Sequence, residues 1–250
     1  MSNSLPIEIP MSAIPYPLDP MGSNLGPYFE LTVKPGILGN STAYGFTPYW
    51  NTGGYCKVMD WGDGSSEDAT ASGTRLTHTY AAAGTYTIRI KADCYRCMFG
   101  YNGIHAQLVY NANGNWDVLG NITVGDRMFE GCTNALFNFS ELPKGLTSAS
   151  YMCKDCTKAT LTLTRLPAGL AGNLISAFDN TPLAVINLDD LTANAPEGGW
   201  TGVRNIMRMF YNAGSGNSPG TVTGSRSAFL AKFPNVTNAT NAFYGTNTTA

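Results

Sequence analysis

The chain has 250 residues, which is enough for one large domain or two small ones with a buried core. Charged residues make up 13% of the chain, well below the usual share in globular proteins, and the net charge of -2 with scattered lysines and arginines argues against a nucleic-acid partner. No apolar run reaches the length of about 18 residues that a membrane span needs, so we expect no membrane insertion. Abundant Gly, Asn, Thr and Ser favour turn-rich β structure or a repeat array.

Residues 1–25 form a proline-rich segment whose composition favours an extended or polyproline-like arm. The segment has no basic stretch followed by a continuous apolar run, so it does not predict a secretory signal. Two interpretations stay open: a disordered tail, or an arm whose apolar side chains lie along a partner surface. The side chains that would dock are Leu5, Ile7, Ile9, Ile14, Tyr16 and Leu18.

Residues 26–93 alternate β-rich runs with turn residues. The runs are 28–33, 55–61, 75–80 and 85–92. In the last run Tyr86, Ile88 and Ile90 share one face, which is the period of a half-buried strand. These patterns predict a small antiparallel β-sandwich, followed by a connecting segment at 94–114.

Three short motifs follow one another within this region. They are Trp-Gly-Asp-Gly at 61–64, His-Thr-Tyr at 78–80 and Gly-Thr-Tyr-Thr-Ile at 84–88. Their order and spacing resemble the PKD (polycystic kidney disease) type of immunoglobulin-like domain. The resemblance implies a non-catalytic surface module.

The acidic residues around the first motif have two interpretations. They are Asp60, Asp63, Glu67 and Asp68. Such oxygen ligands could coordinate calcium, but their spacing does not match an EF-hand. Asp63 and Gly64 also suit a tight turn, because Asp tolerates the left-handed region and Gly adopts it freely. We interpret the segment as a turn, with His78 anchoring the neighbouring strand.

From residue 115 onward a short box recurs. Its copies read RMFEGCT, YMCKDCT, SAFDNT, RMFYNA and NAFYGT. Aligned on Phe129, Cys153, Phe178, Phe210 and Phe243, they are 24, 25, 32 and 33 residues apart, which identifies an internal repeat.

Apolar runs at 159–163 and 184–188 lie between the boxes and predict a strand, then a turn and a short helix that ends in the box. This arrangement resembles the BspA-type leucine-rich repeats of bacterial surface proteins over residues 115–250. The resemblance implies a solenoid with the box residues in its core. Thr181, Ala213 and Thr246 replace the box Cys, so we interpret that column as a packing position for small residues. The predicted fold is therefore mainly β with short helices: an arm, a sandwich and a short solenoid.

The ends of such an array need cover, because each coil buries its apolar faces against its neighbours. We expect the sandwich and the region of Trp116 to cap the N-terminal end. No polar capping unit follows the last box, so we expect that end to meet a partner or a second copy of the chain.

Six cysteines include two CxxC pairs. They are Cys56, Cys94, Cys97, Cys132, Cys153 and Cys156. A zinc ribbon would use both pairs, but their separation exceeds the usual spacing, and neither pair lies in a thioredoxin-like pattern. We expect buried free thiols and no metal site, and leave open a bridge between Cys56 and Cys94.

Catalytic chemistry has little support. His78 and His105 are the only histidines, and no nucleophile, phosphate-loop or zinc-protease motif occurs. Glu130, Asp189 and Asp190 are weak candidates for glycoside cleavage and read better as a polar repeat edge. We expect neither a catalytic site nor a cofactor.

Several aromatic residues fall in Gly- or Asn-rich loops. They are Tyr49, Trp50, Tyr95, Tyr101, Trp200 and Tyr211. Such rings could stack on sugars or anchor an interface, and packing in the core or a cap is the alternative.

Both resemblances imply modules for adhesion or assembly, and three hypotheses follow. The first is a bacteriophage structural protein at the virion surface, for capsid decoration or in the tail, that docks through its arm on the virion shell or tail. The second is a bacterial cell-surface or secreted adhesin that binds glycans or host proteins. The third is an accessory module of a carbohydrate-active enzyme. A homo-oligomer is compatible with each.

Overall fold

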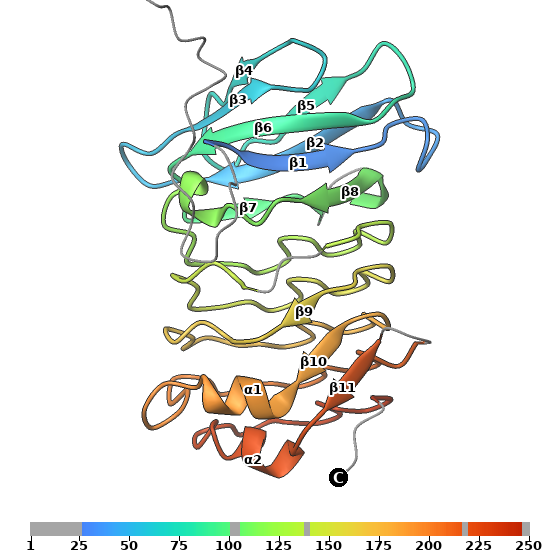
Figure 1. Cartoon of the computed structure of the whole chain (residues 1–250). Helices are drawn as coiled ribbons and strands as arrows, with labels where there is room; N and C mark the ends of the chain where they lie inside the picture. Colours follow the sequence, from blue (N-terminus) through green and yellow to red (C-terminus); the bar gives the residue numbers. More distant parts are fainter. Residues whose placement is uncertain (1–26, 101–105, 138–140, 217–219, 247–250) are drawn as a thin grey trace, which may run out of the picture.

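The computed structural model describes residues 27–100, 106–137, 141–216 and 220–246 (Figure 1). The fold is mainly β with few short helices. An N-terminal unit of two sheets lies at one end, and the repeats follow it as a stack that ends with the two α-helices (Figure 1). The predicted arm and Tyr101 lie outside the described residues.

Two antiparallel sheets build the N-terminal unit, called here the two-sheet unit. The first has the order β4 (Glu67–Asp68), β3 (Cys56–Asp60), β6 (Tyr86–Ala92), β1 (Phe29–Val33) and β8 (Val109–Ala112). The second has the order β5 (Leu76–Thr79), β2 (Ala43–Tyr49) and β7 (Arg96–Met98). Strands β1, β3, β5 and β6 confirm the four predicted runs.

Side chains alternate between core and surface along these strands, as the period of two predicts. In β6, Ile88 and Ile90 are buried and Tyr86 is half-buried. Trp61 is also buried, with its ring centroid 6.2 Å from that of Phe46. The conspicuous Trp of the first motif is therefore a core residue.

The predicted connection at 94–114 is wrong in one respect, because it supplies a strand to each sheet. Strand β7 pairs with β2, and β8 pairs with β1. Both strands are only three or four residues long, and Arg96 in β7 and Tyr110 and Asn111 in β8 interrupt the apolar pattern. The sequence signal was therefore too short to identify them.

A further copy of the box, centred on Phe99, joins the two-sheet unit to the repeats. The Phe99 amide donates to the Met128 carbonyl at 2.7 Å, as the Phe129 amide donates to the Met152 carbonyl at 2.8 Å. The Phe99 and Phe129 rings stack at 5.5 Å. Trp116, in the short 3-10 helix η3 (Trp116–Leu119), also lies 6.2 Å from the Phe129 ring. This packing confirms that the N-terminal end of the stack is covered.

Successive boxes are hydrogen-bonded to one another. The Cys153, Phe178 and Phe210 amides donate to carbonyls of the next box at 2.8 to 2.9 Å. Strands β9 (Thr162–Leu163), β10 (Val185–Asn187) and β11 (Thr221–Thr223) form a parallel sheet beside them. The apolar runs at 159–163 and 184–188 contain β9 and β10, as predicted.

The boxes themselves are turns, and the prediction that a helix ends in them is wrong. Helices α1 (Leu188–Ala193) and α2 (Arg226–Leu230) instead follow β10 and β11 before the box is reached. Within a box, amides bond three residues back, as from Cys132 to the Phe129 carbonyl at 3.1 Å. Two left-handed residues bracket each box. The first column is Arg127, Tyr151, Ser176, Arg208 and Asn241, and the second is Gly131, Asp155, Asn180, Asn212 and Gly245.

The core position of the boxes is confirmed. Phe129, Cys153, Phe178 and Phe210 are buried, and Phe243 of the last box is half-buried. The small-residue column is buried as well at Cys132, Cys156, Thr181 and Ala213. All six cysteines are buried and free.

Candidate interaction surface

The acidic loop after β3 is a turn held by its own carboxylates. Asp60 Oδ1 accepts from the amides of Gly62 at 2.6 Å and Gly64 at 3.2 Å. Asp63 Oδ1 accepts from the Ser65 amide at 3.0 Å and from its hydroxyl at 2.6 Å. Both glycines have positive φ, near 89° and 86°. These bonds confirm the interpretation of the segment as a turn.

His78 connects this turn to the core. Its Nε2 lies 2.7 Å from Asp63 Oδ2, and its ring stacks on Trp61 at 5.0 Å. Hydrogen bonds from the Ser65 side chain first, and then from His78, lower the pKa of Asp63 to about 2. Among the described residues, no group of three or more His, Cys, Asp or Glu side chains is arranged to hold a metal ion.

The Asp63 carboxylate predicts an acid-sensitive part of the stability. Its folded pKa lies below its unfolded value, so its contribution is complete above about pH 4 and is lost as the pH falls towards about 2. In denaturant titrations between about pH 4 and about pH 2, the free energy of unfolding of Asp63→Asn should therefore fall less than that of the native chain. Ser65→Ala removes the main cause of the shift and should raise the Asp63 pKa in an NMR titration. An Asp63 pKa near 4 in the native chain would contradict this prediction.

Tyr49 and Trp50 lie together at the end of β2. The Tyr49 ring is 6.4 Å from that of Tyr95, and the Arg96 guanidinium lies 5.2 Å from the Tyr49 ring centroid. Trp50 is half-buried, and its amide and carbonyl both bond the Ser72 hydroxyl, at 2.8 and 2.9 Å. This aromatic group therefore belongs to the two-sheet unit.

A row of charged and aromatic side chains, called here the ladder, runs along one edge of the boxes. Its members are Arg127, Glu130, Tyr151, Lys154, Asp155, Asp179, Asn180, Arg208, Tyr211 and Tyr244. Arg127 lies 2.7 Å from Glu130, and Arg208 lies 2.9 Å from Asp179. Tyr211 lies in the ladder, so the structure places it apart from Tyr49 and Trp50, which lie in the two-sheet unit.

The ladder ends in an aromatic pair that sequence reasoning missed in part. Tyr211 stacks on Tyr244 at 5.0 Å, and the Arg208 guanidinium covers the Tyr211 ring at 3.9 Å. Tyr244 is 60% exposed, the most exposed large apolar side chain among the described residues. Its position directly after the box Phe, where Tyr211 also stands, was the signal that could have identified it.

Trp200 does not belong to an interaction surface, which corrects the prediction. Its side chain is 1% exposed, its Nε1 donates to the Pro167 carbonyl at 2.9 Å, and its ring stacks on Phe233 at 4.9 Å. The Trp200 amide also donates to the Lys232 carbonyl at 2.7 Å. The Trp200 ring therefore lies beneath the Gly-rich loop, in the core between neighbouring repeats.

Two of the three acidic residues considered for catalysis, Glu130 and Asp189, have structural partners for their side chains. Glu130 pairs with Arg127 and Lys154, as a polar repeat edge would. Asp189 Oδ1 accepts from the Ser225 amide at 2.9 Å, and Asp189 and Asp190 lie in the first turn of α1. His105 lies outside the described residues.

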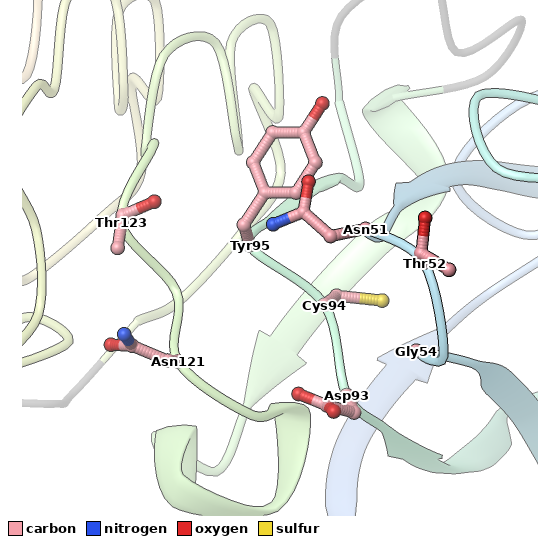
Figure 2. A pocket seen from close by; sticks show the side chains of 8 residues that line it. All are labelled: Asn51, Thr52, Gly54, Asp93, Cys94, Tyr95, Asn121 and Thr123. Carbon is pink, nitrogen blue, oxygen red and sulfur yellow. The ribbon is translucent and has the colours of Figure 1, made fainter.

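A small polar pocket lies where the two-sheet unit meets the first repeat (Figure 2). Its volume is about 190 Å³, and Asn51, Thr52, Asp93, Cys94, Asn121 and Thr123 line it. The lining comes from three segments that are far apart in the sequence. The pocket is too small to enclose a drug-sized ligand, whose sites begin at about 300 Å³.

No helix in the described residues combines the length and apolar character that a bilayer span requires. Comparisons with protein-family models, with curated proteins and with solved structures find no match to this chain. The two resemblances therefore depend on the motifs of the chain alone.

Proposed function

We propose that this chain is a non-catalytic structural protein of a bacteriophage virion surface, placed as a capsid decoration or in the tail. In this proposal the arm docks on the particle, and the described residues display interaction surfaces. A PKD-type sandwich and a BspA-type leucine-rich-repeat solenoid would be its two modules. The observation that carries the proposal is the continuous packing from the two-sheet unit into the boxes.

This packing joins the two-sheet unit and the boxes rigidly, which suits a protein that displays interaction surfaces. The Phe99 amide extends the hydrogen bonding of the boxes into the two-sheet unit, and one core includes residues of both parts. Relative motion of the two parts would break these bonds and expose apolar rings, which costs free energy. The two-sheet unit and the boxes would therefore keep fixed positions relative to each other, and the surfaces of the boxes would stay at a fixed distance from the start of the two-sheet unit, which follows the arm.

Binding of glycans on a bacterial cell surface is the second candidate, and the ladder favours it. The exposed Tyr244 ring and the Tyr211 ring beneath it form an aromatic face of the kind that stacks on sugars. A glycan array with the native chain and with Tyr244→Ala tests this candidate. Loss of a defined glycan signal in the variant would favour adhesion, and release of reducing ends would favour the enzyme-associated alternative.

Deletion of residues 1–25 tests the proposed docking. We expect the full chain to co-sediment with purified particles and the deletion variant to lose at least about ten-fold in incorporation, which corresponds to about 1.4 kcal/mol. Both proteins should show the same circular dichroism and melting temperature, because the proposal assigns the arm to docking and the buried core of the described residues runs from Phe29 to Ala242. Incorporation is measured by quantitative mass spectrometry of gradient-purified particles.

The control keeps the length of the arm and replaces Ile7, Ile9 and Ile14 with serine. It should lose incorporation as the deletion does, because the apolar side chains make the proposed contact. Particles that lack the full chain would refute the virion proposal. Particles that incorporate both variants normally would refute only the role of the arm.

A further inference from the structure

Three thiols gather at the junction of the two-sheet unit and the repeats. Cys56 begins β3, Cys97 lies in β7, and Cys94 lies between β6 and β7. Cys56 is in register with Ala92, which brings Cys94 diagonally close to it. The Cys94 thiol interacts with both other thiols, and its Sγ donates to the Tyr55 carbonyl at 3.6 Å. This group is called here the junction thiols.

The polar pocket reaches one of the junction thiols. Cys94 lines it, and Figure 2 shows the Cys94 side chain among Asn51, Thr52, Gly54 and Asp93. At about 190 Å³ the pocket admits small polar molecules, since a water occupies about 30 Å³ of liquid. A peroxide could therefore approach the Cys94 sulfur.

The boxes contain a second group of three thiols, which serves as an internal comparison. Cys132, Cys153 and Cys156 are all fully buried, and the Cys156 thiol donates to the Phe129 carbonyl at 3.1 Å. Burial raises the pKa of Cys132 and Cys156. The pocket lining includes none of these three residues. Cys94 is only 2% exposed and Cys56 only 1% exposed, so the two groups differ in the pocket beside Cys94 and not in overall burial.

Hydrogen bonding also distinguishes Cys94. Bonds from Cys56 first and from Cys97 next lower the pKa of the Cys94 thiol. Interaction with Cys94 first, and burial next, raise the pKa of Cys56 and Cys97. The thiolate is the reactive form of cysteine, and Cys94 is the junction thiol that lines the pocket, so we assign Cys94 as the nucleophile of the group.

We propose that Cys94 and Cys56 form a peroxide-sensitive dithiol site. The Cys94 thiolate attacks one oxygen of hydrogen peroxide, breaks the O–O bond and becomes a sulfenic acid, while hydroxide leaves and takes up a proton. The Cys56 thiol then attacks the Cys94 sulfur, the S–O bond breaks, and the second water leaves. Overall, two thiols are oxidised to one disulfide and one peroxide is reduced to two waters. The disulfide ties the start of β3 to the segment that leads into the repeats.

Peroxide treatment of the native full chain tests the site. After alkylation under denaturing conditions, peptide mass spectrometry should find a Cys56–Cys94 disulfide, formed at least about ten-fold faster than any thiol of the boxes is lost. Cys97→Ala should still form the disulfide. Cys56→Ala combined with Cys97→Ala removes both neighbouring thiols and should stop at a Cys94 sulfenic acid that dimedone labels, a product that a merely structural thiol would not give.

Cys132→Ala is the matched control, since it removes a thiol from the closed group and should leave the rate of disulfide formation unchanged. Equal loss of thiols in both groups would overturn the proposal. A disulfide between Cys94 and Cys97, or unchanged oxidation of Cys56 in Cys94→Ala, would overturn the assigned pairing and nucleophile. Mapping the disulfide in the peroxide-treated native chain tests the proposal even if a variant does not fold.

Discussion

Replacing Phe210 with alanine should lower the free energy of unfolding by about 3–5 kcal/mol. The ring is fully buried and lies 5.7 Å from Phe178, 5.6 Å from Phe243 and 5.8 Å from Phe229. Its loss removes apolar burial and leaves a cavity between boxes that are held by backbone bonds and cannot fully collapse. The measurement is denaturant unfolding followed by tryptophan fluorescence, because Trp200 lies in the same part of the stack.

Tyr244→Ala is the matched control. It removes an aromatic ring of similar size from the next box, but a ring that is 60% exposed, so the cost should stay below about 1 kcal/mol. Comparable losses in both variants would contradict the claim that the box column forms the core. A smaller midpoint shift together with a changed denaturant slope would instead indicate that the repeats unfold separately.

The sequence predicted the strands whose side chains alternate cleanly. Strand β6 is the best example, because Ile88 and Ile90 mark its buried face. The sequence did not predict strand β2, because Gly45 and Pro48 interrupt the alternation of apolar and polar residues. Gly45 is required there since a side chain would meet the Leu76 carbonyl, and Pro48 lies opposite Cys97 in the antiparallel pairing of β2 with β7. Both exceptions depend on neighbours that are distant in the sequence.

The boxes were predicted as core positions, but their backbone was not. Left-handed conformation suits Asn180 and Asn212, whereas Arg127 and Tyr151 adopt it at a cost of about 1–2 kcal/mol each. Bonds between boxes offset this cost, and no local propensity reveals them. The ring of Phe99 was missed for a related reason, since its box has Tyr101 where the others have Gly, Asp or Asn, and Asn102 in the small-residue column.

The candidate surface was the least predictable part. Residue type and loop composition placed Tyr49, Trp50 and Tyr211 correctly outside the fully buried core. The same signals failed for Trp200, because a Gly-rich loop does not show what lies beneath it. The ladder also needed the structure, since two of its ion pairs, Lys154 with Glu130 and Arg208 with Asp179, join residues about one repeat apart.

Arg208→Ala should destabilise the chain by about 2–4 kcal/mol, near the lower end of the range for breaking a buried ion pair. Asp179 is 1% exposed, and the Arg208 Nε and Nη2 atoms bond its two carboxylate oxygens at 2.9 and 3.3 Å. Removing the guanidinium leaves a buried carboxylate without its cation. Because Arg208 itself is 42% exposed, water can enter its place and reduce the loss.

Two further variants separate the cost of leaving a carboxylate buried without its cation from the simple loss of a charge. Arg165→Ala breaks an exposed pair with Glu141, at 2.6 Å, and should cost less than about 1 kcal/mol. Arg208→Ala combined with Asp179→Ala should be more stable than Arg208→Ala alone, because the unpaired buried charge is gone. If the double variant is the less stable one, the carboxylate is solvated in Arg208→Ala, and Arg208 stabilises the repeats by packing on Tyr211 instead.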